Sequence, residues 1–307
     1  MASKKLFFPF ETMIKTPSKD DRTPLIYYGG KSRDADWIIS NFPAGWSTLV
    51  DVFGGGGAIS FRVGMRGKTI VYNDIGNVCH FMKILRNHGD ELYRRLYFTP
   101  YSRQVFEAAR DNWPAKMVGY KNETDEEKRL EYGLEWARQW YVTVSQGYTH
   151  EEYSDSWKNT ATVNCAESVA NHVDDLPRFV DRLRRMVIEN TDFAKVIPQY
   201  DRPETLFYCD PPYMHDTRVS TGNYENEMTA ERHIELLLSI KNVKGQVVLS
   251  GYSHSLYEEQ LKGWRRVSKS AKSSIQNLSS MDGRGDKTEV LWIKEHAHGL
   301  WSSANVS

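Results

Sequence analysis

The sequence has little of several features that mark other classes of protein. Its three cysteines, Cys79, Cys165 and Cys209, lie far apart in a chain of 307 residues. We therefore expect neither a disulfide framework nor a zinc site of paired cysteines. No apolar run is long enough to span a bilayer, and no stretch has the pattern of a signal peptide. These absences favour a protein of the reducing cytoplasm, with no membrane segment and no metal.

The sequence also lacks an excess of charge of either sign. Lys+Arg and Asp+Glu both number 40, so the formal net charge is zero. Because proteins that bind nucleic acid are more often basic overall, this balance counts mildly against a DNA partner. A local basic patch from Lys262 to Lys272 could still supply the charge, and a solvated surface is the alternative interpretation of that patch.

One stretch of the chain combines a buried strand with an unusual ending. The apolar run 205–209 predicts a strand, and Asp210, Pro211, Pro212 and Tyr213 follow it. Neither proline has an N–H, so the strand cannot continue, and the chain forms a stiff turn at the carboxyl edge of a sheet. There Asp210 and a backbone carbonyl can accept both hydrogens of an amino group, while the Tyr213 ring can stack on a planar base. A purely structural Pro-Pro turn is the alternative.

A second stretch indicates a nucleotide-binding α/β unit. Residues 46–53 predict a strand, the four glycines 54–57 a turn, and residues 58–65 the start of a helix. Residues 69–74 predict the next strand, and Asp74 lies about 20 residues beyond the glycine turn, where such folds place the carboxylate that binds a ribose.

The spacing of the glycines narrows the choice of ligand. The dinucleotide pattern G-x-G-x-x-G/A is not matched, because Ile59 or Ser60 occupies its last position. The turn suits a ligand with an adenosine and no pyrophosphate, such as S-adenosylmethionine. A glycine-rich turn without a ligand is the alternative.

Elsewhere the pattern predicts helices, two further strands and an insertion. The helices are expected over 36–42, 77–90, 101–112, 125–146, 176–187 and 231–240, and the strands over 246–250 and 289–294, with a short strand ending near Asn190. The last helix is expected to place Ile234, Leu237 and Leu238 on one face. Because the α/β alternation stops between 86 and 171, we expect a flexible arm (1–22), a catalytic domain (23–85 and 172–296), an inserted, mostly helical domain (86–171) and a disordered tail (297–307).

Six motifs, in order along the chain, resemble those of the Dam-type, or D12 class, DNA adenine-N6 methyltransferases. They are Tyr27-Tyr28-Gly29-Gly30-Lys31, Asp51-Val52-Phe53-Gly54-Gly55-Gly56-Gly57, Asn73-Asp74, Asn190-Thr191-Asp192-Phe193, Asp210-Pro211-Pro212-Tyr213 and Lys287-Thr288-Glu289-Val290-Leu291. Val52 departs from the family, which often has proline there. The resemblance implies a Rossmann-like, S-adenosylmethionine-dependent methyltransferase sheet with helices on both faces, and an inserted target-recognition domain.

The resemblance also implies an activity and the residues that perform it. The activity is transfer of a methyl group from S-adenosylmethionine to adenine N6 in double-stranded DNA, with the base flipped out of the duplex. The catalytic residues are Asp210, Pro211, Pro212 and Tyr213. The cofactor-binding residues are Tyr27, Lys31, Asp51, Phe53, Gly55, Gly57, Asp74, Asp192, Phe193 and Asp210.

For DNA binding we expect two groups of side chains. Candidates for reading bases in the major groove are Arg138, Gln139, Gln146 and Asn159. Candidates for phosphate contacts are Arg265, Arg266, Lys269 and Lys272. Three alternatives stay open: an N4-cytosine methyltransferase, an RNA N6-adenine methyltransferase, and a catalytically silent DNA-binding subunit. The sequence also leaves open the recognised site, a homodimer and a cognate restriction endonuclease.

Overall fold

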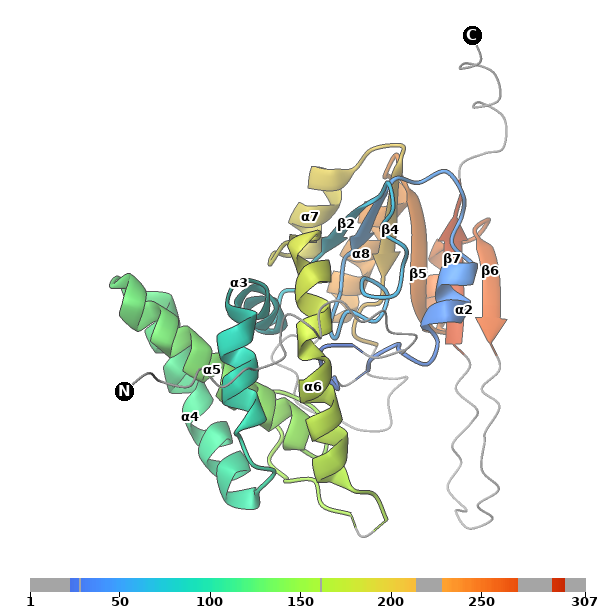
Figure 1. Ribbon diagram of the computed structural model, residues 1–307. Coiled ribbons are helices and arrows are strands. Elements are labelled where there is room, and N and C mark those ends of the chain that lie inside the picture. The colour runs from blue at the N-terminus through green and yellow to red at the C-terminus, as the bar shows by residue number, and fades with distance from the viewer. Residues whose placement is uncertain (1–22, 28, 161, 214–227, 270–288, 296–307) are drawn as a thin grey trace, which may run out of the picture. The chain divides into compact units, whose positions relative to one another are not determined.

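The computed structural model describes residues 23–27, 29–160, 162–213, 228–269 and 289–295 (Figure 1). The expected arm (1–22), Lys272 and the expected tail (297–307) lie outside these residues. Two compact units are present. The helical unit contains residues 23–36, 54–63 and 76–190, and the sheet unit contains the described residues of 37–53, 64–75 and 191–295. Each unit is therefore assembled from three separate stretches of the chain.

The strands form a seven-stranded sheet with the order β3-β2-β1-β4-β5-β7-β6. Their bounds are β1 Thr48–Asp51, β2 Thr69–Tyr72, β3 Val187–Ile188, β4 Thr205–Cys209, β5 Gln246–Tyr252, β6 Arg265–Lys269 and β7 Glu289–Lys294. Strands β2, β1, β4 and β5 are parallel neighbours, whereas β7 runs antiparallel to both β5 and β6. The mostly parallel sheet with its helices confirms the predicted methyltransferase-type α/β fold.

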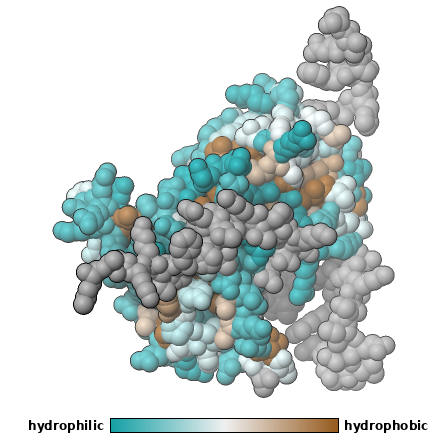
Figure 2. Space-filling model, viewed as in Figure 1, coloured by the Kyte–Doolittle hydropathy of each residue, from teal (hydrophilic) through white to brown (hydrophobic). Residues whose placement is uncertain are grey.

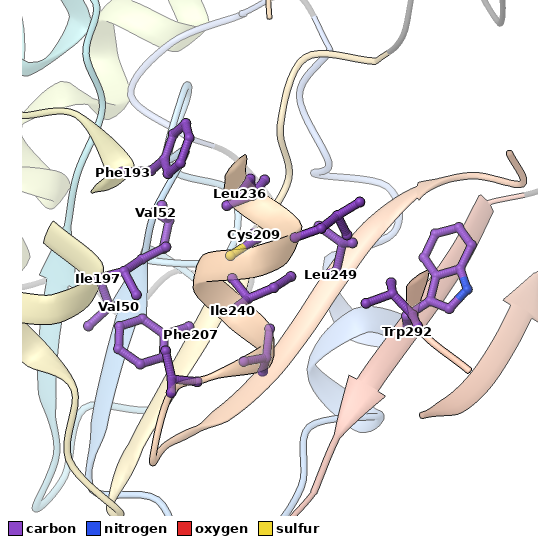
Figure 3. Close-up of a cluster of buried hydrophobic side chains, with 14 of the residues drawn as sticks. Val50, Val52, Phe193, Ile197, Phe207, Cys209, Leu236, Ile240, Leu249 and Trp292 are labelled. Carbon is purple, nitrogen blue, oxygen red and sulfur yellow. The ribbon is translucent and has the colours of Figure 1, made fainter. Parts of the chain in front are cut away.

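The central strands β1, β2, β4 and β5 are mostly apolar because both faces of the sheet are covered there. On one face Val50, Phe207 and Leu249 join a core with residues of α7 (Phe193–Tyr200), α8 (Ala230–Lys241) and α9 (Ser255–Gln260) (Figure 3). On the other face Tyr208 lies against Phe42, which follows α2 (Ala35–Ser40), with their ring centroids 6.1 Å apart. The buried strands expected over 205–209 and 246–250 agree with this arrangement.

The helical unit is built around α5 (Glu126–Gln146), which packs against α3 (Val78–Tyr97), α4 (Arg103–Asn122) and α6 (Cys165–Arg184). Two glycines let α4 and α5 approach closely. A Cβ on Gly119 would lie 2.9 Å from the Tyr132 ring, and a Cβ on Gly133 would lie 2.9 Å from the Tyr120 ring. Trp136 and Trp140 are fully buried further along α5, and its second half is buried on nearly all sides.

Several elements differ from the expectation. The helix expected over 58–65 is wrong: the segment forms separate turns, with the Phe61 N–H donating to the Gly57 carbonyl (2.8 Å) and the Val63 N–H to the Ile59 carbonyl (3.0 Å). The Arg182 guanidinium donates to the Ser60 carbonyl (2.8 Å) and to the Val63 carbonyl. Its N–H groups thus replace the backbone N–H donors that a continuous helix would have supplied to these carbonyls.

Other differences concern where helices begin and end. Helix α4 continues through Pro114, and α6 begins at Cys165 and contains Pro177. Helix α3 also continues past the expected end, with a bend at His88. The expected domain boundaries at 86 and 171 therefore fall inside α3 and α6. The short helices α7 and α9 and strand β6 were not predicted.

The surface seen in Figure 2 is mostly hydrophilic, and the three cysteines are buried. Figure 2 shows hydrophobic residues as separate patches on a mostly hydrophilic face. Cys79, Cys165 and Cys209 are all free and buried. In the residues that the structure describes, no helix has both the length and the hydropathy to cross a bilayer.

Candidate active site

Acidic residues follow three neighbouring parallel strands of the sheet unit. Asp51 ends β1 and is 1% exposed, and it lies in register with Tyr72 of β2 and Tyr208 of β4. Asp74 and Asp210 each come two residues after those partners. Because parallel strands end at the same edge, all three carboxylates lie at one edge of the sheet. Asp74 and Asp210 belong to strands two places apart, which separates them by roughly 10 Å.

The predicted turn directly follows β4, and the end of β1 lies beside it. The Val52 N–H donates to the Tyr208 carbonyl at 2.9 Å, which holds the end of β1 against the end of β4. Asp210 is half-buried and Pro211 is buried. Burial, followed by the negative charge of Asp210, raises the pKa of Tyr213 well above its usual value, so this phenol keeps its proton at neutral pH.

Tyr213 has contacts on its face and at its hydroxyl. Its ring centroid lies 4.3 Å from that of Tyr252, with an angle of 36° between the rings. Its hydroxyl donates to the Glu289 carboxylate, 3.3 Å from Oε2 and 3.4 Å from Oε1. Tyr252 therefore covers one face of the Tyr213 ring, and a planar ligand can stack only on the opposite face.

Asn73 connects segments that are far apart in the sequence. Its Nδ2 donates to the Val52 carbonyl (2.8 Å) and to the Thr191 carbonyl (3.0 Å), and its Oδ1 accepts from the Thr191 N–H (3.1 Å). Asn73 is 1% exposed. The buried amide thus fixes the chain just before the glycine turn and just before α7. The sequence motif marked this residue, but only the structure reveals that its amide joins these segments.

Asp192 and Phe193 lie at the start of α7. Asp192 caps the helix, since its Oδ1 accepts from the Ala194 N–H at 2.9 Å, and its Oδ2 is paired with Arg232 of α8. The Phe193 ring lies 5.9 Å from the Phe53 ring and 4.3 Å from the Arg232 guanidinium. The hydrogen bond to Asp192 is the main cause that raises the pKa of Arg232. Sequence reasoning missed Arg232, because no local motif contains it.

The helical unit holds the other expected cofactor residues. Gly55 and Gly57 adopt left-handed backbone conformations, with φ of +48° and +81°. The Tyr27 ring covers the turn, 3.5 Å from the position that a Cβ on Gly55 would take. Lys31 is 9% exposed. The backbone conformation therefore favours glycine at both positions, and at Gly57 the Phe61 ring, 2.4 Å from where a Cβ would lie, also excludes a side chain.

The structure separates the candidates for base recognition. Arg138 is half-buried and paired with Glu135 (2.6 Å). Gln139 is 8% exposed and donates to the same carboxylate. Gln146 is 2% exposed, accepts from the Ser102 N–H and donates to the Pro100 carbonyl, both at 3.2 Å. Burial and these bonds argue against base contacts by Gln139 and Gln146, which instead hold the helical unit together, whereas Asn159 is exposed.

The described residues among those expected to bind phosphate, Arg265, Arg266 and Lys269, lie on β6. Arg265 and Arg266 are exposed and paired with acids, Arg265 with Glu295 (2.6 Å) and Arg266 with Glu258 (3.0 Å). Lys269 lies over the Trp37 ring, with Nζ 5.7 Å from its centroid. Because each arginine already has a carboxylate partner, the local positive charge is smaller than the sequence suggests.

Comparison with known proteins identifies the family. The family described as D12 class N6 adenine-specific DNA methyltransferase matches residues 27–275. The chain belongs to this family. It is 23% identical over 227 residues to "Modification methylase StsI" of Streptococcus sanguinis, covering 69% of this chain and 31% of that protein. It is 40% identical over 52 residues to "Type II methyltransferase M2.HphI" of Haemophilus parahaemolyticus, covering 17% of this chain and 16% of that protein.

Membership of the D12 class implies S-adenosylmethionine as methyl donor, and the residues of the sheet unit fit such a ligand. A carboxylate after β2 suits a ribose diol, and the paired Phe53 and Phe193 rings suit the apolar faces of an adenine. No group of three or more His, Cys, Asp or Glu suited to a metal ion is present in the described ranges. The chain spans about a third of the length of the first of these relatives and less of the second.

Proposed function

We propose that this protein transfers a methyl group from S-adenosylmethionine to N6 of adenine in double-stranded DNA. The observation that carries the proposal is the position of Asp210. It directly follows the fully buried strand β4, at the same edge as Asp51 and Asp74, and three residues before Tyr213. The sheet unit thereby supplies an acceptor for an amino group, a ring for stacking and acids that can bind a nucleoside.

The chemistry requires an acceptor of this kind. The lone pair of adenine N6 is delocalised into the ring, so this nitrogen is a poor nucleophile. The Asp210 carboxylate and a backbone carbonyl of the Pro-Pro turn would accept the two N6 hydrogens, localise the lone pair and stabilise the positive charge that develops on the nitrogen. S-adenosylmethionine supplies, when bound, a methyl group made electrophilic by its sulfonium. Afterwards the extra N6 proton would leave through these acceptors to solvent.

The remaining residues would bind the two ligands. Asp74 would bind the ribose, and Phe53 and Phe193 the adenine ring of the cofactor. Asp51, Asp192, Gly55, Gly57, Tyr27 and Lys31 are the further candidates for cofactor contacts. The target adenine would be flipped out of the duplex and stacked on Tyr213, an interaction worth roughly 1–3 kcal/mol.

DNA binding and biological context are also proposals. Arg138, Asn159, Arg265, Arg266 and Lys269 are the described candidates for DNA contacts, and the two arginines on β6 would exchange their acid partners for phosphates. The names of the two relatives favour a restriction–modification role, with a cognate endonuclease acting at the same site, over an orphan methylase. Such an enzyme would act in the cytoplasm, at the nucleoid, as a monomer or a homodimer.

Incorporation of tritiated methyl groups into plasmid DNA and, in parallel, into RNA, followed by nucleoside analysis, tests the proposal. We expect the label in N6-methyladenine. Label in N4-methylcytosine, label in RNA alone, or no label would each overturn the proposed reaction. Those outcomes correspond to the three alternatives that the sequence left open.

Replacing the acceptor tests the mechanism. Asp210→Ala is expected to lower kcat by on the order of 10²–10³-fold, as loss of one transition-state partner does, while cofactor affinity is largely kept. The matched control is Asp111→Ala on α4, an exposed aspartate paired with Arg110. Methylation by Asp210→Ala at the wild-type rate would remove Asp210 from the chemistry.

A further inference from the structure

Glu289, the first residue of β7, lies beside the proposed site although it is distant from it in the sequence. Its carboxylate accepts from the Tyr213 hydroxyl at 3.3 and 3.4 Å. It also accepts from the Ser250 hydroxyl at 2.5 Å. Two hydroxyl donors from different segments therefore converge on one carboxylate. One of the donors, Tyr213, comes three residues after Asp210 in the sequence.

The pairing of β5 and β7 explains this convergence. The antiparallel register places Glu289 directly opposite Tyr252. Side chains alternate along a strand, so Ser250 and Tyr252 lie on the same face of β5, and Glu289 lies on that face too. On its other side β6 places Lys269 opposite Glu289. A carboxylate, a hydroxyl and an aromatic ring thus form a rigid surface on adjoining strands, and Tyr213 lies against it.

We propose that Glu289 is a positioning residue for the target base, acting through the Tyr213 hydroxyl to hold the outer end of the stacking ring in place. This inference rests on the proposed function and extends it to a residue outside the Asp-Pro-Pro-Tyr motif. Tyr252 restrains the ring from one face, and Glu289 restrains its outer rim. The contact with Tyr252 limits rotation of the ring about its Cβ–Cγ bond, and the hydrogen bond to Glu289 keeps the ring from tilting toward solvent.

The electrostatic surroundings keep this hydrogen bond intact. Burial, Asp210 and Glu289 together raise the pKa of Tyr213, so its hydroxyl keeps the proton that it donates. A hydrogen bond from a neutral hydroxyl to a carboxylate is stronger than one between two neutral groups. Ser250 is fully buried, so its own bond to Glu289 is shielded from water. The Tyr213 ring is therefore oriented before any base arrives.

Preorganisation of this kind predicts a specific kinetic signature. Loss of the restraint leaves cofactor contacts unchanged, but the flipped base meets a ring whose orientation is averaged over several positions. Glu289→Gln and Tyr213→Phe should each lower kcat/KM for DNA by about tenfold, the size expected for one charge-assisted hydrogen bond. The dissociation constant for S-adenosylmethionine should stay within about twofold of the wild-type value.

A double-mutant cycle separates positioning from general weakening. If Glu289 acts through the Tyr213 hydroxyl, Glu289→Gln has no further effect once Tyr213→Phe has removed that hydroxyl, and the double variant is about as active as either single variant. The matched control is a second tyrosine–carboxylate pair, Tyr93 and Asp174, whose oxygens lie 3.5 Å apart in the helical unit. Tyr93→Phe and Asp174→Asn should leave kcat/KM for DNA unchanged.

The possible results are distinguishable. Effects of the two variants that multiply to about a hundredfold loss, or a Glu289→Gln variant with wild-type kinetics, would overturn the inference while the proposed function stands. A wild-type protein that methylates no adenine would overturn the proposed function itself. If Glu289→Gln fails to fold, Tyr213→Phe removes the same bond and keeps the carboxylate, so wild-type kinetics for that variant would overturn the inference alone.

Discussion

Gly57→Ala is the substitution whose effect can be worked out most fully from the structure. Gly57 has a φ of +81°, a conformation that side chains other than glycine rarely adopt. A Cβ at this position would lie 2.4 and 2.5 Å from two ring carbons of Phe61. That ring is nearly buried and packs edge-to-face against Phe179, with the centroids 5.2 Å apart. Phe61 can therefore make room only by giving up its contact with Phe179.

Two energetic costs set the loss of stability that we expect for Gly57→Ala. The left-handed conformation costs an alanine roughly 1–2 kcal/mol, and forcing an extra methyl group into a packed site costs roughly 1–3 kcal/mol. Gly67 is a matched control, because its φ is +68° and a Cβ there would meet nothing within 4 Å. We expect Gly67→Ala to lower the free energy of unfolding by about 1–2 kcal/mol and Gly57→Ala to lower it by about 2–5 kcal/mol.

Urea unfolding of both variants measures these differences, and calorimetric titration with S-adenosylmethionine measures the consequence for the glycine turn. Under the proposed function, Gly57→Ala should weaken cofactor binding and Gly67→Ala should not. Equal losses of stability in the two variants would refute the claimed contact with Phe61. A large loss of stability with unchanged cofactor affinity would instead show that the turn tolerates displacement without harm to binding.

Two further predictions concern buried polar groups. Asn73→Ala removes the partners of the Val52 carbonyl and the Thr191 backbone, so unfolding should become easier by roughly 2–4 kcal/mol; a change below about 0.5 kcal/mol in urea would contradict this bridging role. Burial, then Lys121 and Lys83, lower the pKa of His80 from 6.5 to about 4. Because the folded pKa is depressed, the stability contributed by neutral His80 is present above pH 6.5 and is lost as the pH falls toward 4. Solvent screens this half-buried side chain, so between pH 8 and pH 5 the wild type should lose about 1 kcal/mol more free energy of unfolding than His80→Gln. Identical pH profiles by urea unfolding would contradict it.

The strands and the turn after β4 could be predicted because their signals are local. The expected strand 205–209 and the last strand 289–294 coincide with β4 and β7. Strand β6 was missed because its residues, Arg265 to Lys269, are charged and polar. It forms at the edge of the sheet through pairing with β7, a long-range contact that outweighs low strand propensity.

The helices show where local patterns are insufficient. In α8 the expected face of Ile234, Leu237 and Leu238 is wrong for two residues, since Ile234 is 44% and Leu238 is 53% exposed. The buried stripe is His233, Leu236, Leu237 and Ile240, and it is selected by the core of the sheet unit rather than by hydropathy alone. Pro114 likewise did not end α4, because tertiary packing against α5 stabilises the helix on both sides of the proline.

The residues of the candidate site also differ in whether their signals are local in the sequence. The positions of Asp51, Asp74 and Asp210 at strand ends could be predicted because strand and motif coincide there. Arg232 and Glu289 were not assigned a role, because their partners Asp192 and Tyr213 are 40 and 76 residues away in sequence. The burial of Gln146 could not be predicted, because a buried amide and an exposed one look alike in sequence.

The burial of all three cysteines has a practical consequence. Burial raises the pKa of the Cys209 thiol well above its usual value, and Cys79 and Cys165 are also removed from solvent. Thiolate is the form that alkylating reagents attack, so maleimides and iodoacetamide should react slowly with the native protein. A single cysteine introduced on an exposed loop could then carry a fluorophore, and base extrusion could be followed in real time without first removing the natural thiols.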